Sequence, residues 1–257
     1  MVLVRPAGGA NVGAVCRAIK NMGGGPLTIV GGSFDVEEAR RMAVHAGDVL
    51  AERRQVGGLR EALAGCGTVV GTTARRGAYR SRARDVREIA AMLARRTGED
   101  AHARPALVFG CERSGLSNRD LAACHHLAYV PMATLQPSLN LAQAVLICLY
   151  EVYRARAAAA DGKTAGVGAG PVSGERVTAS ALEDTFDALQ EALIEIGFLP
   201  AENPAHLMFS LRAMLGRTEM SSRELRIMRG IARQIRWYAR GGCEVAIEKR
   251  ARGERLR

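Results

Sequence analysis

The sequence is poor in aromatic residues and has no long apolar run. Phe, Trp and Tyr make up only 4% of the 257 residues, so a buried core must be built from aliphatic side chains and Met. No segment approaches the roughly 18 consecutive apolar residues of a membrane span. Residues 1–6 also lack the apolar centre of a secretion signal. We therefore expect no membrane partner and a cytoplasmic location.

Cysteine pairs of the C-x-x-C kind are missing as well. The six cysteines are scattered, at positions 16, 66, 111, 124, 148 and 243. Cys124, His125 and His126 are adjacent, but neighbouring residues of a helix point in different directions and rarely share one ion. The sequence thus predicts neither a disulfide framework nor a metal site, and it favours a reducing compartment.

Acidic residues are in short supply. Asp and Glu number 26 against 36 Lys and Arg, which gives a net charge of +10 and a pI near 9.9. A basic surface attracts polyanions, of which nucleic acid is the usual one. A basic protein without such a partner is the alternative at this point.

Short apolar segments alternate with helical patterns along the first part of the chain. Strands are expected at residues 2–5, 27–30, 67–71, 106–109 and 127–131. Helices are expected near residues 12–22, 37–45, 58–65, 84–95, 117–124 and 138–155. This alternation is typical of an α/β fold with a parallel sheet.

The composition changes after this part. A stretch rich in Gly, Ala and Ser predicts a flexible linker over residues 157–178, although the preceding helix extending through Ala160 is an alternative. Apolar residues then recur at helical spacing, and further helices are expected at 205–215 and 221–240. The predicted organisation is an α/β domain (1–156), the linker, and a small all-helical domain with a basic tail (179–257).

A glycine-containing loop lies between the first strand and the first helix. It reads Gly-Gly-Ala-Asn-Val-Gly over residues 8–13, and Asp35 follows downstream. The context suits a Rossmann dinucleotide loop, but the spacing departs from G-x-G-x-x-G. An NAD-dependent oxidoreductase therefore remains an alternative. Asn11 is expected to cap the helix that follows.

Three motifs occur in order in the first domain. Asn11-Val12-Gly13 is followed by Arg17-Ala18, Phe109–Leu116 reads FGCERSGL, and Ser138–Ala144 reads SLNLAQA. In the last of these, Ser138 or Asn140 is placed to cap a helix. Together the motifs closely resemble those of SpoU-type enzymes in the SPOUT superfamily of RNA 2′-O-methyltransferases, over residues 2–154.

This resemblance implies features that periodicity does not show. They are a trefoil knot in the C-terminal part of the parallel sheet, S-adenosylmethionine as cofactor, and a homodimer in which the partner chain completes each site. Glu112 and Asn140 are implied to brace the site loops, and Asn11 and Arg17 to be the catalytic residues facing RNA. The residues implied to bind the cofactor are Thr72, Thr73, Ala74, Gly110, Val130, Ser138, Leu139 and Asn140.

Arg17 is often described in this family as the catalytic residue. A guanidinium keeps its proton in nearly all settings, so a simple general base is an unsuitable description. We expect Arg17 to grip the phosphate beside the target ribose and polarise the 2′-hydroxyl, while a substrate phosphate accepts the proton.

Residues 186–235 resemble the helical extension of bacterial TrmJ-like tRNA methyltransferases. The resemblance implies tRNA as substrate and the ribose of nucleotide 32, a cytidine or uridine of the anticodon loop, as target. Methylation of ribosomal RNA, or RNA binding without catalysis, are the alternatives.

The helix expected at 221–240 carries an arginine stripe. The arginines recur at steps of three and four, and Trp237 lies at the stripe's edge. An apolar stripe is expected roughly opposite, packed on the other helices. Because almost no acid is interleaved, the stripe predicts contact with RNA phosphates. The residues proposed for that contact are Arg226, Arg229, Arg233 and Arg236.

Overall fold

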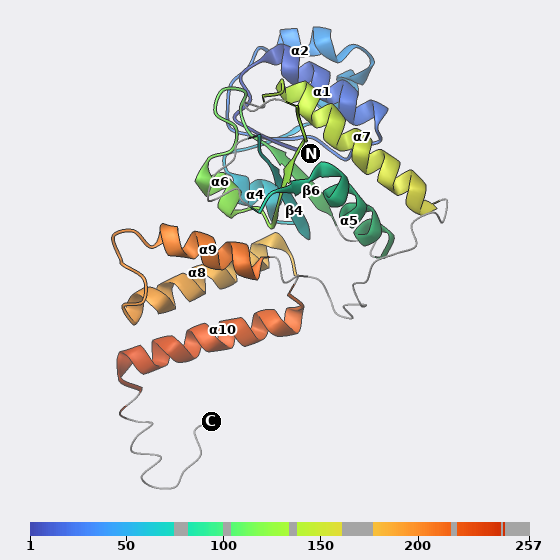
Figure 1. Ribbon diagram of the computed structural model, residues 1–257. Coiled ribbons are helices and arrows are strands. Elements are labelled where there is room, and N and C mark those ends of the chain that lie inside the picture. Colours follow the sequence, from blue (N-terminus) through green and yellow to red (C-terminus); the bar gives the residue numbers. More distant parts are fainter. Residues whose placement is uncertain are drawn as a thin grey trace. The chain divides into compact units, whose positions relative to one another are not determined.

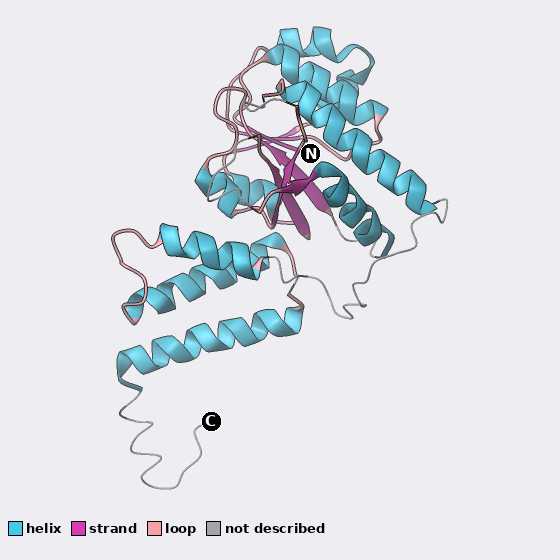
Figure 2. Ribbon diagram, in the orientation of Figure 1, coloured by secondary structure: helices cyan, strands magenta, loops and turns pink. Residues whose placement is uncertain are grey.

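The computed structural model describes residues 1–74, 82–99, 104–133, 138–160, 177–216, 220–242 and 244. The chain divides into two compact units, Met1–Pro171 and Val172–Arg257. Within the described ranges, strands occur in the first unit and the second is helical (Figure 2).

A seven-stranded parallel sheet forms the centre of the first unit. Its strand order is β3-β2-β1-β6-β4-β7-β5, which confirms the predicted parallel α/β fold. The strands are β1 (Val2–Val4), β2 (Thr28–Val30), β3 (Arg54–Val56), β4 (Thr68–Thr72), β5 (Arg84–Asp85), β6 (Pro105–Phe109) and β7 (His126–Tyr129).

Helices cover both faces of this sheet (Figure 1). One face carries a layer in which α1 packs against α2 and α7, and α7 against α5. This layer comprises α1 (Gly9–Asn21), α2 (Val36–Ala43), α3 (Gly47–Ala51), α5 (Val86–Glu99) and α7 (Leu141–Ala160). The short helices α4 (Leu59–Leu63) and α6 (Asn118–Ala122) lie on the other face.

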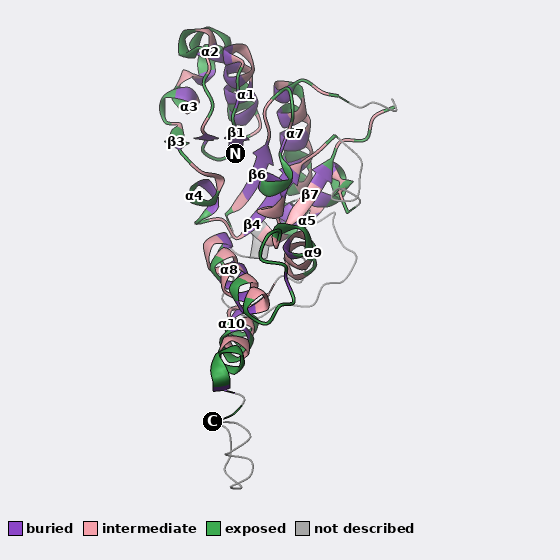
Figure 3. Ribbon diagram, turned by 90° about the vertical axis from the view of Figure 1, so that its left-hand side faces the viewer, coloured by how far each residue is buried: buried purple, intermediate pink, exposed green. Residues whose placement is uncertain are grey.

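Aliphatic side chains fill the core between the sheet and the α1–α7 layer, as the low aromatic content predicts. Figure 3 shows buried residues, in purple, along β4, β6, α1 and α7. Leu3 of β1 and Ile29 of β2 are completely buried, and so are Val15 of α1 and Val145 of α7. Buried positions on α1 recur at steps of three and four, so this helix turns one apolar side to the sheet and exposes the other.

Several local predictions need correction. Strands β3 and β5 were not expected, because both are short and mostly polar. Helix α1 begins at Gly9 with Gly8 as its N-cap, so Asn11 is not the cap. Helix α7 extends through Ala160 and takes up the start of the expected linker, whose residues 161–176 lie outside the described part.

The second unit contains α8 (Ala179–Glu195), α9 (Ala205–Leu215) and α10 (Ser222–Trp237), followed by one turn at Tyr238–Gly242. A small core joins them and includes Leu182 and Phe186 from the predicted apolar stripe, together with Met208 and Leu225. Helix α10 starts with a capping box, in which Ser221 and Glu224 bond each other's backbone N–H groups.

Candidate active site

A cleft lies at one edge of the sheet, where three neighbouring strands end. Strands β6, β4 and β7 are adjacent and parallel, so the segments that follow them meet at the same edge. Such carboxyl-end crevices are the usual ligand sites of open α/β sheets. Residues just before α7 and from its first two turns close the remaining side.

The cleft gathers nearly all of the residues expected to bind the cofactor. Of the expected residues, Thr72, Thr73, Ala74, Gly110, Val130, Ser138 and Leu139 line it. Residues that sequence reasoning missed also line it, among them Cys111, Arg113, Met132, Ala144 and Cys148.

Gly110 allows a tight loop after β6. A Cβ atom built on Gly110 would lie 2.0 Å from the carbonyl carbon of Gly115, closer than real side chains come. The loop is also held by a bridge between Cys111 and Gly115, which has a φ of +64°. Glycine at both positions therefore lets the loop fold against itself beside the cleft.

Neutral hydrogen bonds anchor the strand ends that form the cleft. The Thr72 hydroxyl donates to the Val108 carbonyl at 3.0 Å, and the Thr73 N–H donates to the Ala128 carbonyl at 2.9 Å. These bonds tie the end of β4 to β6 on one side and β7 on the other. The cleft wall is thus fixed mainly by backbone.

A hydrogen-bonded bracket connects the three sequence motifs. Asn140 donates from Nδ2 to Oδ1 of Asn11 at 2.8 Å, and Asn11 donates from Nδ2 to Oε1 of Glu112 at 3.0 Å. Glu112 also accepts from the backbone N–H groups of Ala7 and Gly8, both at 3.1 Å. The bracket joins loops more than a hundred residues apart in sequence.

The bracket acts on the charge of Glu112 as well. Partial burial would raise the pKa of its carboxyl group, but the hydrogen bonds from Asn11, Gly8 and Ala7 outweigh burial and lower that pKa. Glu112 is therefore an ionised acceptor in the bracket, in keeping with its expected bracing role.

Of the two roles expected for Asn140, bracing the loops and lining the cofactor site, its contacts fit the first. It is not among the cleft-lining residues, and its side chain serves the bracket instead. Its Oδ1 also accepts from the N–H of Ala142 at 2.9 Å, so Asn140 is the residue that caps α7. Asn11 likewise uses both atoms of its amide within the bracket.

Arg17 lies elsewhere on α1. Its side chain is exposed, it does not line the cleft of its own chain, and it has no hydrogen bond or ion pair with the described residues. It follows Asn11 by six residues, or about 9 Å along the helix axis. The structure therefore leaves this guanidinium available to a ligand outside the cleft.

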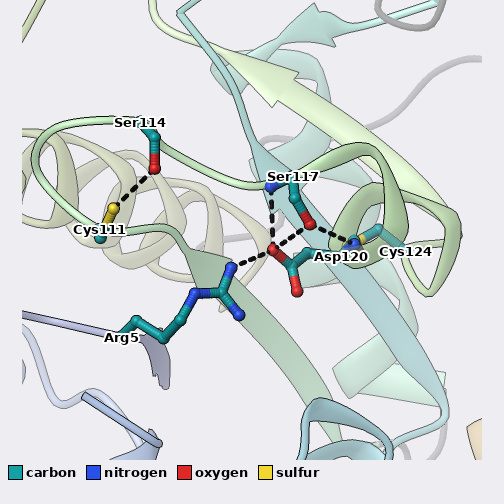
Figure 4. Close-up of polar contacts among 6 residues, drawn as sticks. All are labelled: Arg5, Cys111, Ser114, Ser117, Asp120 and Cys124. Atoms are coloured by element: carbon teal, nitrogen blue, oxygen red, sulfur yellow. Dashed lines mark hydrogen bonds and ion pairs between the residues drawn. The ribbon is translucent and has the colours of Figure 1, made fainter.

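A second polar cluster holds the end of the 110–117 loop at Ser117 (Figure 4). Arg5, at the end of β1, forms an ion pair of 2.5 Å with the buried Asp120 of α6, and Ser117 donates to the same carboxylate. Partial burial raises the pKa of Asp120, but the bonds from Arg5 and Ser117 outweigh it and lower that pKa. The S-x-x-D capping-box spacing of Ser117 and Asp120 was the available sequence signal.

Two of the α10 arginines that were predicted to contact RNA are bonded to the neighbouring helix α8 instead. Arg229 donates to the Thr185 hydroxyl and the Ala181 carbonyl, both at 2.9 Å, and Arg236 pairs with Glu191 and Glu195 on α8. The acids that balance the stripe thus come from the neighbouring helix. The stripe borders the packed face of α10 rather than lying opposite it.

The apolar stripe of α10 is also only partly buried. Leu225 is buried and packs in the core of the unit, whereas Ile231 and Tyr238 are 44% and 38% exposed. Arg226 and Arg233 are exposed and have no polar partner among the described residues.

Neither a metal site nor a membrane-spanning helix is found among the described residues. Within the described ranges, no group of three or more His, Cys, Asp or Glu side chains is arranged to hold a metal ion. No described helix has the length and apolar character needed to cross a membrane. His125 accepts a hydrogen bond at Nδ1 from the Val69 N–H at 3.1 Å, which gives it a structural role.

The comparisons with known proteins agree across the chain. The SpoU rRNA methylase family matches residues 1–150, and the C-terminal domain of the tRNA methyltransferase TrmJ matches residues 180–251. The tRNA (cytidine/uridine/adenosine-2′-O-)-methyltransferase TrmJ of Pseudomonas aeruginosa is 39% identical over 246 residues, covering 94% of this chain and 95% of its own length.

Other relatives show the same similarity. The tRNA (cytidine/uridine-2′-O-)-methyltransferase TrmJ of Cronobacter sakazakii is 36% identical over 240 residues, covering 91% of this chain and 94% of its own length. The crystal structure of TrmJ from Z. mobilis ZM4 superposes with a TM-score of 0.75 at 27% identity, covering 91% of this chain and 97% of that one.

These similarities confirm the resemblance drawn from the three motifs. They also exclude the oxidoreductase alternative, since the family is one of RNA methyltransferases. The chain belongs to the SpoU methylase family and, over nearly its whole length, to the TrmJ enzymes within it.

Proposed function

We propose that this protein transfers a methyl group from S-adenosylmethionine to the 2′-hydroxyl of a tRNA ribose. The observation that carries the proposal is the convergence of three distant motifs on one cleft and its bracket. The tRNA assignment rests on the relatives, which are named tRNA methyltransferases over almost the full length of this chain.

The cleft suits the proposed cofactor. It is lined by small residues, apolar side chains and strand-end backbone, and Gly110 lets the loop after β6 fold tightly beside it. Thr73, Gly110, Val130 and Leu139 would hold the cofactor by backbone and apolar contact. When bound, S-adenosylmethionine supplies an activated methyl group, so the protein's task is to align the acceptor hydroxyl and assist its deprotonation.

Arg17 is the proposed catalytic residue on the acceptor side. Its free guanidinium would grip the phosphate next to the target ribose and polarise the hydroxyl, while a substrate phosphate takes the proton. Asn11 is better assigned to positioning, because the bracket occupies its amide. Through Asn11, the bracket would fix the position of α1, and hence of Arg17, within the first unit.

A homodimer would bring Arg17 to a cleft. Arg17 does not line the cleft of its own chain, so the proposal places it at the partner's site. Helix α7 offers a surface for such pairing: Leu146, Tyr150 and Tyr153 are 42%, 45% and 53% exposed and follow at steps of four and three. Light scattering should give twice the chain mass at micromolar concentration, and a monomer there would contradict the dimer.

The trefoil knot is part of the same proposal. Its support is the chain's membership of the SpoU methylase family.

Ribosomal RNA is the second candidate substrate, because the family model of the first unit is described as an rRNA methylase. The TrmJ C-terminal match favours tRNA, and nucleotide 32 of the anticodon loop is the proposed target.

A methyl-transfer assay separates the two. The full chain would be incubated with radiolabelled S-adenosylmethionine and either unmodified tRNA or rRNA, and the product digested to locate ribose methylation. We expect label in tRNA, as a 2′-O-methylnucleoside at position 32. Label in rRNA alone would establish the second candidate, and label in neither would refute the proposed function.

A further inference from the structure

The second unit has a pocket of its own at the C-terminal end of α10. It is lined by Ala188 of α8 and by residues of α10 and the turn after it: Arg229, Ala232, Arg233, Arg236, Trp237, Arg240, Gly241 and Gly242. All of these lie within the helical unit. Four arginines and the chain's single Trp thus share one concave surface.

Three of these arginines are fixed by α8. Arg229 bonds Thr185 and Ala181, Arg236 pairs with Glu191 and Glu195, and Arg240 pairs with Glu195 at 2.7 Å. Of the four guanidinium groups that line the pocket, those of Arg236 and Arg240 pair with two carboxylates, which leaves two positive charges in excess among these groups. Arg233 is exposed and has no polar partner among the described residues.

Trp237 is held in place beside Arg233. The backbone of Gly242 packs so closely on the indole that a Cβ at position 242 would lie 2.4 Å from Cδ2. The Tyr238 ring meets the indole edge-on, with the ring centroids 5.1 Å apart. Trp237 nevertheless remains 37% exposed and lines the pocket. A fixed, partly exposed aromatic surface is thus placed next to an unpaired cation.

We propose that this pocket binds one unstacked nucleotide of single-stranded RNA, with the base against Trp237 and its phosphate on Arg233. Aromatic side chains bind splayed-out bases by stacking, and a guanidinium fork matches a phosphate. Arg229, Arg236 and Arg240 are positioning residues that hold the pocket through α8. The inference rests on the proposed tRNA substrate and places one of its contacts away from the methyl-transfer cleft.

Because Trp237 is the only Trp, its fluorescence reports on this pocket alone. The full chain would be titrated with a short single-stranded oligoribonucleotide, with the same sequence as a duplex, and with inorganic phosphate. We expect saturable quenching by the single strand at the lowest concentration. Equal quenching by phosphate would reduce the pocket to a plain anion site, and no quenching by the single strand would also overturn the proposal.

Variants test the same pocket with tRNA. Arg233→Gln and Trp237→Leu should each weaken tRNA binding about tenfold, as expected for loss of a stacked base or its phosphate contact. Trp237→Phe keeps an aromatic ring for stacking, so it should bind tRNA nearly as tightly as the wild type does. Arg223→Gln is the matched control, since Arg223 is exposed on α10 and does not line the pocket. Equal losses for Arg233→Gln and Arg223→Gln would contradict the proposal.

The two proposals fail separately. If the wild type methylated tRNA but Arg233→Gln and Trp237→Leu bound it normally, the pocket would be wrong and the proposed function would stand. If the wild type methylated no tRNA but the oligoribonucleotide still quenched Trp237 specifically, the proposed function would be wrong and the nucleotide pocket would stand.

Discussion

The two units build their candidate sites in different ways. The cleft of the first unit is made of segments from residue 72 to residue 148, joined by backbone contacts and by the bracket of Asn140, Asn11 and Glu112. The pocket of the second unit comes from one helix and its neighbour, joined by ion pairs between arginines and glutamates.

This difference determines what a substitution should do. In the first unit, a change in the bracket shifts loops that are far apart in sequence, so it should affect cofactor and substrate together. In the second unit, charges on one helix divide between those bonded to α8 and those left to solvent. Substitution of an arginine that is bonded to α8 should lower stability, whereas substitution of one that is left to solvent should affect only RNA binding.

The largest expected effect is that of Arg17→Ala. Loss of its proposed grip on the phosphate and hydroxyl should lower methyl transfer by at least about 100-fold, the usual scale for removing one preorganised transition-state donor. Cofactor affinity should not change, because Arg17 does not line the cleft. Arg41→Ala, an exposed arginine on α2, is the control. Near-normal turnover of Arg17→Ala would refute its assignment.

Breaking the bracket should have the next largest effect. Asn140→Ala removes both the bond to Asn11 and the α7 cap, so cofactor affinity should fall by up to about tenfold, or ~1.4 kcal/mol. The melting temperature should fall with it. Calorimetry with S-adenosylmethionine and thermal unfolding measure the two. Asn118→Ala, at the start of another helix, should change neither; unchanged values for Asn140→Ala would show that the bracket is dispensable.

Two arginines of α10 should respond in opposite ways. Arg236→Gln loses its pairs with Glu191 and Glu195, so it should lower the stability of the helical unit by about 0.5–1 kcal/mol, the scale of partly exposed ion pairs. Arg226→Gln should leave stability unchanged, weaken tRNA binding a few-fold and reduce its salt slope by about one. If the stability losses were equal, the division between bonded and free arginines would not hold.

A further expected effect is a pH dependence of stability that arises from two histidines of the first unit. Burial lowers the pKa of His125 to about 4 and that of His126 to about 3, with a further contribution from Arg96. In the unfolded chain both titrate near 6.5, so the unfolded state binds more protons below that pH. Stability should therefore be full above pH 6.5 and decline from there towards pH 3. His126→Gln should flatten this decline, and an equally steep decline would contradict the assignment.

Much of the first unit could be predicted because its signals are local. Buried strands such as residues 106–109 are apolar runs. In the second unit, helix α8 is likewise revealed by a local signal, its apolar stripe. Strands β3 and β5 escaped prediction because an edge strand with polar residues has no apolar run to reveal it. The knot had to come from family resemblance, since periodicity contains no information about threading.

The motifs predicted the candidate cleft and bracing roles for Glu112 and Asn140, but not the hydrogen bonds that join these two residues to Asn11. The partners of Asn11 lie 101 and 129 residues away, and no spacing rule connects them. For α10, the sequence led to the wrong prediction that its arginines lack acidic partners. Its arginines look unbalanced within the helix, but Glu191 and Glu195 of α8 face them after folding. The domain boundaries, the homodimer and the cytoplasmic location stay predictions.

The central claim is that the three motifs form an S-adenosylmethionine site. A crystal structure of the full chain with S-adenosylmethionine would test it most directly. The account predicts the cofactor in the cleft, in contact with Thr73, Gly110, Val130 and Leu139, with the bracket of Asn140, Asn11 and Glu112 intact beside it. Cofactor density at another place, or none in the cleft at saturating concentration, would contradict it.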